Sequence, residues 1–410
     1  MSTSAHPIAG ASETDSSAAW FRLGIALAMG TIGSVGMWSV VVALPAVQAD
    51  FGVLRADASL PFTFTMIGFG LGGVVLGRLA DRFGIVVPIL IGAACIGIGY
   101  VAAGYSANIW QFALACALVG IGSSATFGPL VADISHWFVV RRGIAVAVAS
   151  AGNYLAGAVW PPIVQHFIQT SGWRPTYIGI GIFCVVTMVP LTLLLRKRVS
   201  QHGDAAAGAL AAGALDRLGI SSNTLLVLLA IAGAACCVAM SMPQVHIVAY
   251  CGDLGYGVAR GAEMLSLMLG LGIISRIASG FIADRIGGVA TLMIGSTLQG
   301  VALFLYLFFD GLVSLYIVSG LFGLFQGGLV PMYAVIVREY FPPREAGTKL
   351  GIVLMATLAG MAFGGWVSGF IFDLTGSYQA AFLNGLMWNF LNVSIAAWLL
   401  LRPGRRLVAA

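Results

Sequence analysis

The chain is predicted to be an all-α membrane protein with twelve transmembrane helices in two pseudo-symmetric bundles of six. Three observations predict this fold class. Hydrophobic residues make up 59% of the 410 residues and charged residues only 9%, whereas soluble domains carry roughly 25% charged residues. Apolar stretches of about 20 residues, the length that crosses a ~30 Å hydrocarbon core, recur along the chain. An eight-residue pattern also occurs twice, 203 positions apart.

Six apolar stretches fall in each half of the chain, and each is long enough to cross a membrane as one helix. Their expected limits are 21–49, 58–80, 85–105, 109–134, 143–169, 173–195, 223–250, 259–282, 288–309, 312–338, 346–373 and 376–401.

The repeated pattern reads G-R-L-A-D-R-F-G at 77–84 and G-F-I-A-D-R-I-G at 280–287. The same offset aligns Asp50 with Asp253 and extends through the rest of both halves. Two parallel half-proteins built from membrane helices are typical of secondary transporters.

Polar and small residues mark the segments outside the helices. We expect a disordered cytoplasmic tail over 1–20, a first bundle over 21–198, a cytoplasmic linker over 199–220, a second bundle over 221–402 and a cytoplasmic tail over 403–410. The linker assignment follows from its Ala- and Gly-rich composition.

The cations predict the orientation. With a cytoplasmic N-terminus, sixteen of the 20 Lys and Arg residues lie on the inner side and three, Arg55, Arg174 and Arg260, on the outer side. This bias follows the positive-inside rule and predicts a multi-pass membrane protein with both termini cytoplasmic. The net charge of +5 is explained by this topology, so no nucleic-acid partner is expected.

The sequence lacks the minimum parts of several enzyme classes. No HExxH, GxSxG or phosphate-binding glycine loop occurs, which argues against a hydrolase or an ATP-driven pump. The six cysteines have no metal-ligand spacing. We therefore predict no enzyme activity, no metal and no cofactor.

The paired G-x-x-x-D-R-x-G patterns resemble the signature loop of the major facilitator superfamily, over nearly the whole chain. Three further segments, 136–143, 246–250 and 372–378, are similar to the bacterial branch related to monocarboxylate transporters and the oxalate/formate antiporter. The resemblance implies the major facilitator fold, alternating access and a protein that works as a monomer. It also implies that the signature loops, with Asp81, Arg82, Asp284 and Arg285, form an inner gate, in which the carboxylates accept from helix N-termini of the opposite bundle.

Arg276 is the one cation left within a predicted span once the others are assigned to the two edges. An intramembrane Arg costs from about 2.5 to well over 10 kcal/mol, so it normally faces a wet cavity or a partner. Its planar guanidinium matches a carboxylate in bidentate geometry. We therefore predict that Arg276 binds an anionic substrate, although snorkelling to the surface or a permanent ion pair is the alternative.

Arg276 also resembles the substrate-binding Arg that the monocarboxylate and oxalate transporters carry in their eighth segment. Two departures matter. The oxalate transporter carries a second basic residue in segment 11, but here Lys349 lies at the cytoplasmic start of that segment. The animal monocarboxylate transporters carry a Lys in segment 1, and this segment has no Lys here. A single cation favours a monoanion over a dianion.

Proton coupling requires a titratable group near the transport path. Asp253 and His246, at the outer end of segment 7, are the predicted pair. Asp50 occupies the equivalent place in the first half, so the alternative is that both aspartates cap turns. Among the polar and aromatic side chains of the central helices, Tyr333 and Asn153 are predicted to contact substrate beside Arg276.

These observations predict the symport of a small, lactate-like monocarboxylate with one proton. Three alternatives stay open. They are a carboxylate antiporter of the oxalate/formate type, a multidrug exporter, which a lone buried Arg opposes, and a carboxylate sensor that does not transport.

Overall fold

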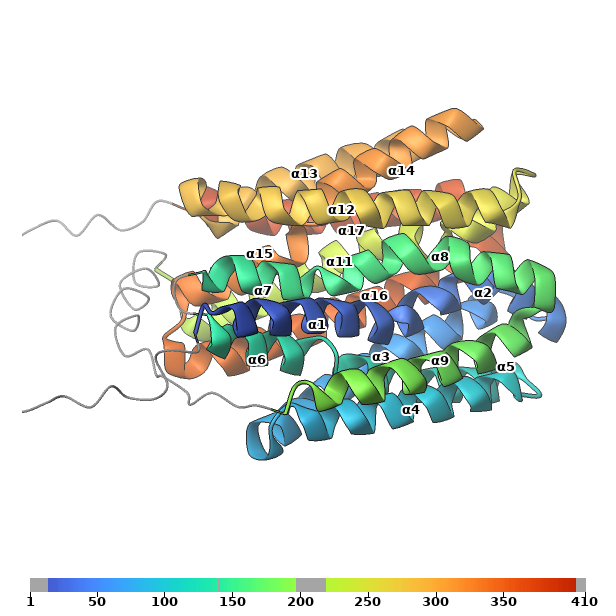
Figure 1. Cartoon of the computed structure of the whole chain (residues 1–410). Helices are drawn as coiled ribbons and strands as arrows, with labels where there is room; N and C mark the ends of the chain where they lie inside the picture. The colour runs from blue at the N-terminus through green and yellow to red at the C-terminus, as the bar shows by residue number, and fades with distance from the viewer. Residues whose placement is uncertain (1–13, 139–140, 197–218, 403–410) are drawn as a thin grey trace, which may run out of the picture.

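The computed structural model describes residues 14–138, 141–196 and 219–402, and these residues form α-helices joined by short connections. The helices run side by side along one direction (Figure 1). Outside the described residues lie 1–13 of the predicted N-terminal tail, 199–218 of the predicted linker and all of the predicted C-terminal tail. The first helix begins at Ser17, within the predicted N-terminal tail.

The described residues contain twelve helical spans that are long and apolar enough to cross a membrane, which confirms the predicted fold class. Eight spans are single helices, and four consist of two consecutive helices. The first half contains α1 (Ser17–Gly33), α2 (Val35–Phe51), α3 (Arg55–Phe83), α4 (Val86–Gly104), α5 (Ile109–Ser124), α6 (Gly128–Trp137), α7 (Arg142–Ser150), α8 (Gly152–Ser171) and α9 (Trp173–Leu193). The second half contains α11 (Ser222–Asp253), α12 (Val258–Ile286), α13 (Gly288–Tyr306), α14 (Leu312–Gln326), α15 (Leu329–Tyr340), α16 (Pro343–Thr375) and α17 (Tyr378–Leu401).

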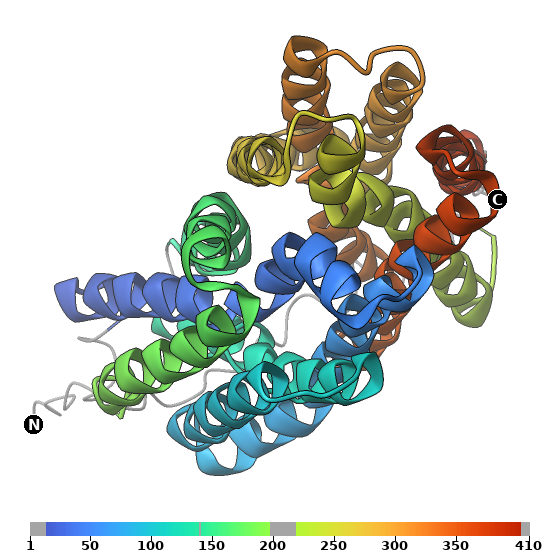
Figure 2. The ribbon, with the colours of Figure 1, turned by 90° about the vertical axis from the view of Figure 1, so that its right-hand side faces the viewer.

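The repeat seen in the sequence is a structural repeat. Helices α3 and α12 start and end 203 residues apart. Seen along the helices, the blue-to-green first half and the yellow-to-red second half form two groups that lie against each other (Figure 2). The groups meet mainly where α3 packs on α16 and α8 packs on α12.

Glycines allow some of these helices to approach closely. A Cβ on Gly68 would lie 2.1 Å from the Ala117 carbonyl oxygen, and one on Gly360 would lie 2.3 Å from that of Ala234. Gly73, in contrast, has nothing within 4 Å of an added Cβ. This side of α3 therefore faces open space.

Candidate functional site

Arg276 projects from α12 to the junction of the two bundles. Its Nη1 donates to the carbonyl oxygen of Ser150 at 2.9 Å and its Nε to that of Gly327 at 3.3 Å. The guanidinium carbon lies 4.2 Å from the centre of the Tyr154 ring. No carboxylate pairs with Arg276 among the residues that the structure describes. The Arg276 charge is therefore held by dipoles and a ring face, without a compensating anion.

Breaks in two spans provide the carbonyl oxygens that hold Arg276. Span 5 breaks between α7 and α8, where Ser150 ends the first helix. Span 10 breaks between α14 and α15, and the residue four positions after Gly327 is Pro331, which has no N–H to donate. Freed carbonyls at membrane depth are tolerated where protein groups satisfy them. The Arg276 guanidinium satisfies one carbonyl from each bundle.

A central cavity of about 380 Å³ lies beside Arg276. Its wall contains Asn153 and Tyr154 of α8 from one bundle and Gln244 of α11 from the other. The Nδ2 of Asn153 donates to the Met37 sulfur at 3.3 Å, and its Oδ1 accepts from the Trp38 indole at 3.2 Å. The Gln244 amide has no hydrogen-bond partner in the described part of the chain and is not fully enclosed. Its polar atoms are free for a molecule in the cavity.

The two side chains predicted to contact substrate beside Arg276 lie in different places. Asn153 lies in the cavity wall with Arg276, and its contact with substrate stays a prediction. Tyr333 lies outside the cavity, fully buried, and its hydroxyl donates to Asn392 Oδ1 at 2.8 Å between α15 and α17. Sequence reasoning missed Gln244, because a single amide in an apolar helix gives no periodic signal.

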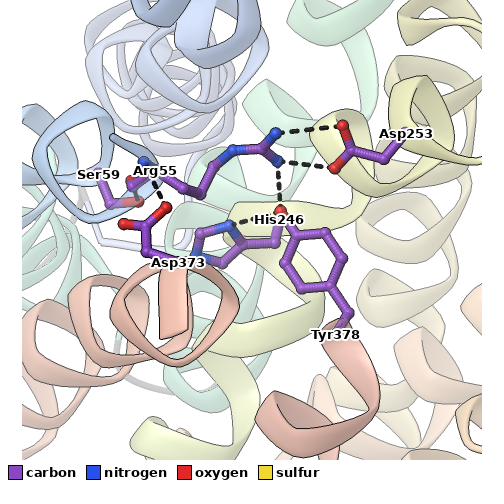
Figure 3. A network of polar contacts seen from close by, with 6 residues as sticks. All are labelled: Arg55, Ser59, His246, Asp253, Asp373 and Tyr378. Carbon is purple, nitrogen blue, oxygen red and sulfur yellow. Dashed lines mark hydrogen bonds and ion pairs between the residues drawn. The ribbon is translucent and has the colours of Figure 1, made fainter. Parts of the chain in front are cut away.

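The bundles are locked together at the end of the molecule where α3 begins. Arg55 donates from Nη1 to Asp253 Oδ2 at 3.0 Å and from Nη2 to Oδ1 at 3.2 Å (Figure 3). The Arg55 side chain is only 8% exposed, so this bidentate ion pair across the bundles is shielded from water on the arginine side. The guanidinium also donates to the Tyr378 hydroxyl and lies over the Phe372 ring.

A second acid joins this closure. The carboxylate of Asp373, at the end of α16, accepts from the backbone N–H groups of Arg55 at 2.9 Å and Ala56 at 2.7 Å. Helix α3 has no side-chain cap of its own, since Leu54 occupies the N-cap position. Asp373 therefore caps α3 from the opposite bundle, where the helix dipole favours an anion.

Tyr378 connects the closure to His246. The Tyr378 hydroxyl lies 3.3 Å from His246 Nδ1, and His246 Nε2 lies 2.8 Å from the Gly365 carbonyl oxygen. A carbonyl only accepts, so Nε2 carries a proton and donates, and Nδ1 accepts from the hydroxyl. Asp253 and His246, which were predicted together, thus belong to one hydrogen-bonded network with Arg55 (Figure 3).

This end of the molecule breaks the repeat. Asp50, the counterpart of Asp253, pairs with Arg174 of its own bundle at 2.8 Å. Arg174 is the second residue of α9, and the second residue of α17 is the neutral Gln379. Asp253 therefore has no arginine in its own bundle at that place and takes Arg55 from the other. Neither aspartate caps a turn through its side chain.

The signature loops make no such contacts in this conformation. The side chains of Asp81, Arg82, Asp284 and Arg285 form no hydrogen bond or ion pair with any described residue, although Arg82 lies over the Phe83 ring. The predicted capping of a helix by an acid of the opposite bundle occurs instead at the other end, through Asp373. The bundles are thus joined at the Arg55 end, and these gate residues are unengaged at the Phe83 end.

The twelve membrane-length spans of the described residues, arranged as two related bundles around a central cavity, are typical of the class of multi-pass membrane transporters. A family model described as Major Facilitator Superfamily matches residues 26–319 and 264–409. The chain belongs to the major facilitator superfamily, as its signature loops predicted, and is therefore a transporter and not an enzyme.

Curated relatives narrow the branch. The chain is 26% identical to monocarboxylate transporter 13 of Bos taurus over 321 residues, covering 76% of this chain and 73% of the relative. It is 25% identical to the Rattus norvegicus protein of that name, covering 87% and 82%. It is also 26% identical to an uncharacterized MFS-type transporter, YcxA, of Bacillus subtilis, covering 82% and 83%. These relatives confirm the predicted resemblance to monocarboxylate transporters.

Solved structures agree on the fold. A bacterial homologue of the human lysosomal transporter Spinster, in an inward-facing and unoccupied conformation, matches with a TM-score of 0.68 at 15% identity and covers 95% of this chain and 96% of that one. The occupied inward-facing form of that homologue matches with a TM-score of 0.70 at 14% identity, covering 93% and 96%. At such identities the likeness concerns the fold alone.

Proposed function

We propose that this transporter moves a monocarboxylate across the bacterial inner membrane together with one proton, by alternating access. The observation that carries the proposal is Arg276, a cation beside the central cavity for which the described chain provides no carboxylate. A charge at membrane depth needs a counter-ion, and a substrate carboxylate meets that need. The names of the curated relatives support the same substrate class.

Arg276 is suited to bind and release its substrate. The two carbonyl bonds and the Tyr154 ring orient the guanidinium without neutralising it. The carbonyls come from the two bundles, so the position of Arg276 depends on how the bundles sit. Asn153 and Gln244 offer amides at the same cavity, and a lone cation suits a monoanion such as lactate.

Proton coupling is assigned to Asp253, with His246 linked through Tyr378. While the bundles are joined at the Arg55 end, the guanidinium occupies both carboxylate oxygens of Asp253. When that end opens, Asp253 loses Arg55 and its oxygens become accessible to a proton from the outer side. The outward-open state is therefore the one that takes up the proton. Orientation by the cation distribution puts the Arg55 end outside and the signature loops inside.

The proposed transport cycle involves two movements. The two bundles, 21–198 and 221–402, move against each other around the 199–220 linker. The signature loops engage as the inner gate when the outer side opens. Both ends are then closed by the same interaction, in which a carboxylate of one bundle caps a helix N-terminus of the other.

Uptake of radiolabelled carboxylates into proteoliposomes tests the proposal. A pH gradient that is acidic outside should drive uptake, and a membrane potential, worth about 2.3 kcal/mol per charge per 100 mV, should have little effect because a monoanion and a proton move together. Arg276→Ala should abolish transport and Arg276→Lys should retain little of it, with both variants folded. Normal transport by Arg276→Ala would end the carboxylate-site proposal.

A further inference from the structure

We propose that the substrate is an apolar, aryl-bearing monocarboxylate, with its carboxylate on Arg276 and its ring among the methionines of the cavity. This inference rests on the proposed function and specifies its substrate. It rests on three properties of the cavity wall: its composition, its size and its charge.

Methionine is the most frequent residue type in the wall of the cavity. Five line the cavity, and they come from both bundles: Met37 of α2, Met66 of α3, Met240 of α11, and Met355 and Met361 of α16. The rings of Trp38, Phe69 and Phe127 lie among them. Thioethers adapt their shape and make favourable contacts with aromatic rings, with the sulfur about 5 Å from the ring. The methionines and aromatic rings of this wall therefore suit a flat apolar group.

The size of the cavity favours a substrate larger than a three-carbon acid. Its volume of about 380 Å³ falls in the ~300–1,000 Å³ range of sites that enclose drug-sized ligands. A lactate ion bound to Arg276 would cover one corner of it and leave the methionine wall in contact with water. An aryl group would instead bury that wall.

The charges of the wall define the rest of the molecule. Arg276 is the one charged side chain that lines the cavity within the described ranges, and no Asp or Glu lines it. A second carboxylate would have no cation, and an ammonium group would have no acid. The part of the substrate beyond its carboxylate must therefore be neutral. This excludes dicarboxylates and zwitterionic amino acids as preferred substrates.

Three 2-oxo acids with one head group and different tails test the inference: pyruvate, 4-methyl-2-oxopentanoate and phenylpyruvate. In proteoliposomes the half-saturation concentration should fall along the series. Burying ~100 Å² of apolar ring surface at about 25 cal/mol per Å² corresponds to a gain on the order of 10- to 100-fold for phenylpyruvate. Equal or tighter binding of pyruvate would overturn the aryl inference and leave carboxylate transport standing.

Gly73 provides a variant that narrows the cavity. It lines the wall, and an added Cβ meets nothing within 4 Å, so Gly73→Leu places its side chain in the open space. Gly24→Leu is the matched control, because Gly24 is equally unobstructed but lies outside the wall. Phenylpyruvate affinity should fall at least tenfold in Gly73→Leu, while pyruvate affinity should stay within about twofold and Gly24→Leu should match wild type.

Two other outcomes are decisive. If Gly73→Leu affects both acids equally while its melting temperature is unchanged, the ring does not occupy this cavity and the inference is wrong. If wild type transports none of the three acids and thermal shifts with each are unaffected by Arg276→Ala, the proposed function itself is wrong. The wild-type series decides the question even if Gly73→Leu does not fold.

Discussion

Arg55 and Asp253 form a bidentate ion pair that joins the two halves of the molecule at one end, whereas Asp50, the counterpart of Asp253, pairs with Arg174 inside its own half. The same kind of residue is thus used for two purposes. Within the first bundle the aspartate ties neighbouring helices together, and in the second it ties one bundle to the other. In the proposed transport cycle the Arg55–Asp253 pair breaks whenever this end of the molecule opens.

Removing the Arg55–Asp253 pair should therefore open the outer side. In Asp253→Asn the guanidinium loses its bidentate partner, and hydrogen bonds to charged groups contribute about 1.5–3 kcal/mol each. Ser59 is fully buried beside Gly369 of the opposite bundle, so Ser59→Cys reports opening. A membrane-impermeant thiol reagent should label this cysteine at least tenfold faster when Asp253→Asn is added.

The parent chain without Ser59→Cys is the control for native cysteines, five of which are buried. Exchanging the charges, Arg55→Asp with Asp253→Arg, should partly restore slow labelling. Unchanged labelling in Asp253→Asn would mean that the pair does not hold this end closed.

Asp373 should contribute to closure separately, through the α3 N-terminus. Loss of an N-cap costs about 0.5–2 kcal/mol, so Asp373→Ala should raise Ser59→Cys labelling by a smaller factor, about threefold to tenfold. Asp373→Asn keeps the acceptor oxygen without the charge and should fall between wild type and Asp373→Ala. If Asp373→Asn behaves like Asp373→Ala, the charge on the helix dipole is the important term.

The dependence of transport on pH should be lost when Asp253 cannot ionise. Wild-type uptake should rise as the outer pH falls, because in the proposed cycle each substrate is carried together with one proton taken from the outer side. Asp253→Asn should instead catalyse substrate exchange at a rate that does not vary with outer pH, and should fail to accumulate substrate against a gradient. Pyranine fluorescence inside the vesicles measures proton entry, and a normal proton-to-substrate ratio in the variant would exclude Asp253 from coupling.

Parts of this arrangement could be predicted from the sequence and parts could not. The twelve spans could be predicted because crossing lipid requires long apolar helices, and Arg276 stands out because a membrane span rarely contains a cation. Arg55 was assigned to the outer loops, yet it is buried, and its partner is 198 positions away. Counting charges at each edge gives the orientation but does not tell which charges meet, because that depends on how two bundles pack.

Arg22 and Asp133 make the same point inside one bundle. Arg22 and Asp133 form a largely buried ion pair, with Nε 2.8 Å from Oδ2. Asp133 is thereby occupied with packing α1 against α6. An acid near membrane depth is thus a candidate for coupling only when its partner belongs to the other bundle, and among Asp50, Asp133 and Asp253 that holds for Asp253 alone.

Gly73 corresponds to Arg276 at the offset of 203 residues, and both line the central cavity. Gly73→Arg would give the cavity a second cation at the pseudo-symmetric position, and the open space around an added Cβ leaves room for the side chain. Two cations match a dianion, so the variant should gain affinity for oxalate or malonate by tenfold or more and lose it for monocarboxylates with apolar tails.

Thermal stabilisation by each acid in detergent, followed by uptake, measures this change. Gly73→Gln is the control, since it adds similar bulk without the charge and should weaken the binding of monocarboxylates with bulky apolar tails without any gain for dianions. If Gly73→Arg binds no dicarboxylate and Arg276 still binds monocarboxylates normally, the two positions do not share one cavity during transport. A gain for oxalate in Gly73→Arg that disappears with Arg276→Ala would show that both guanidinium groups hold one substrate. The single cation would then be what restricts this carrier to monoanions.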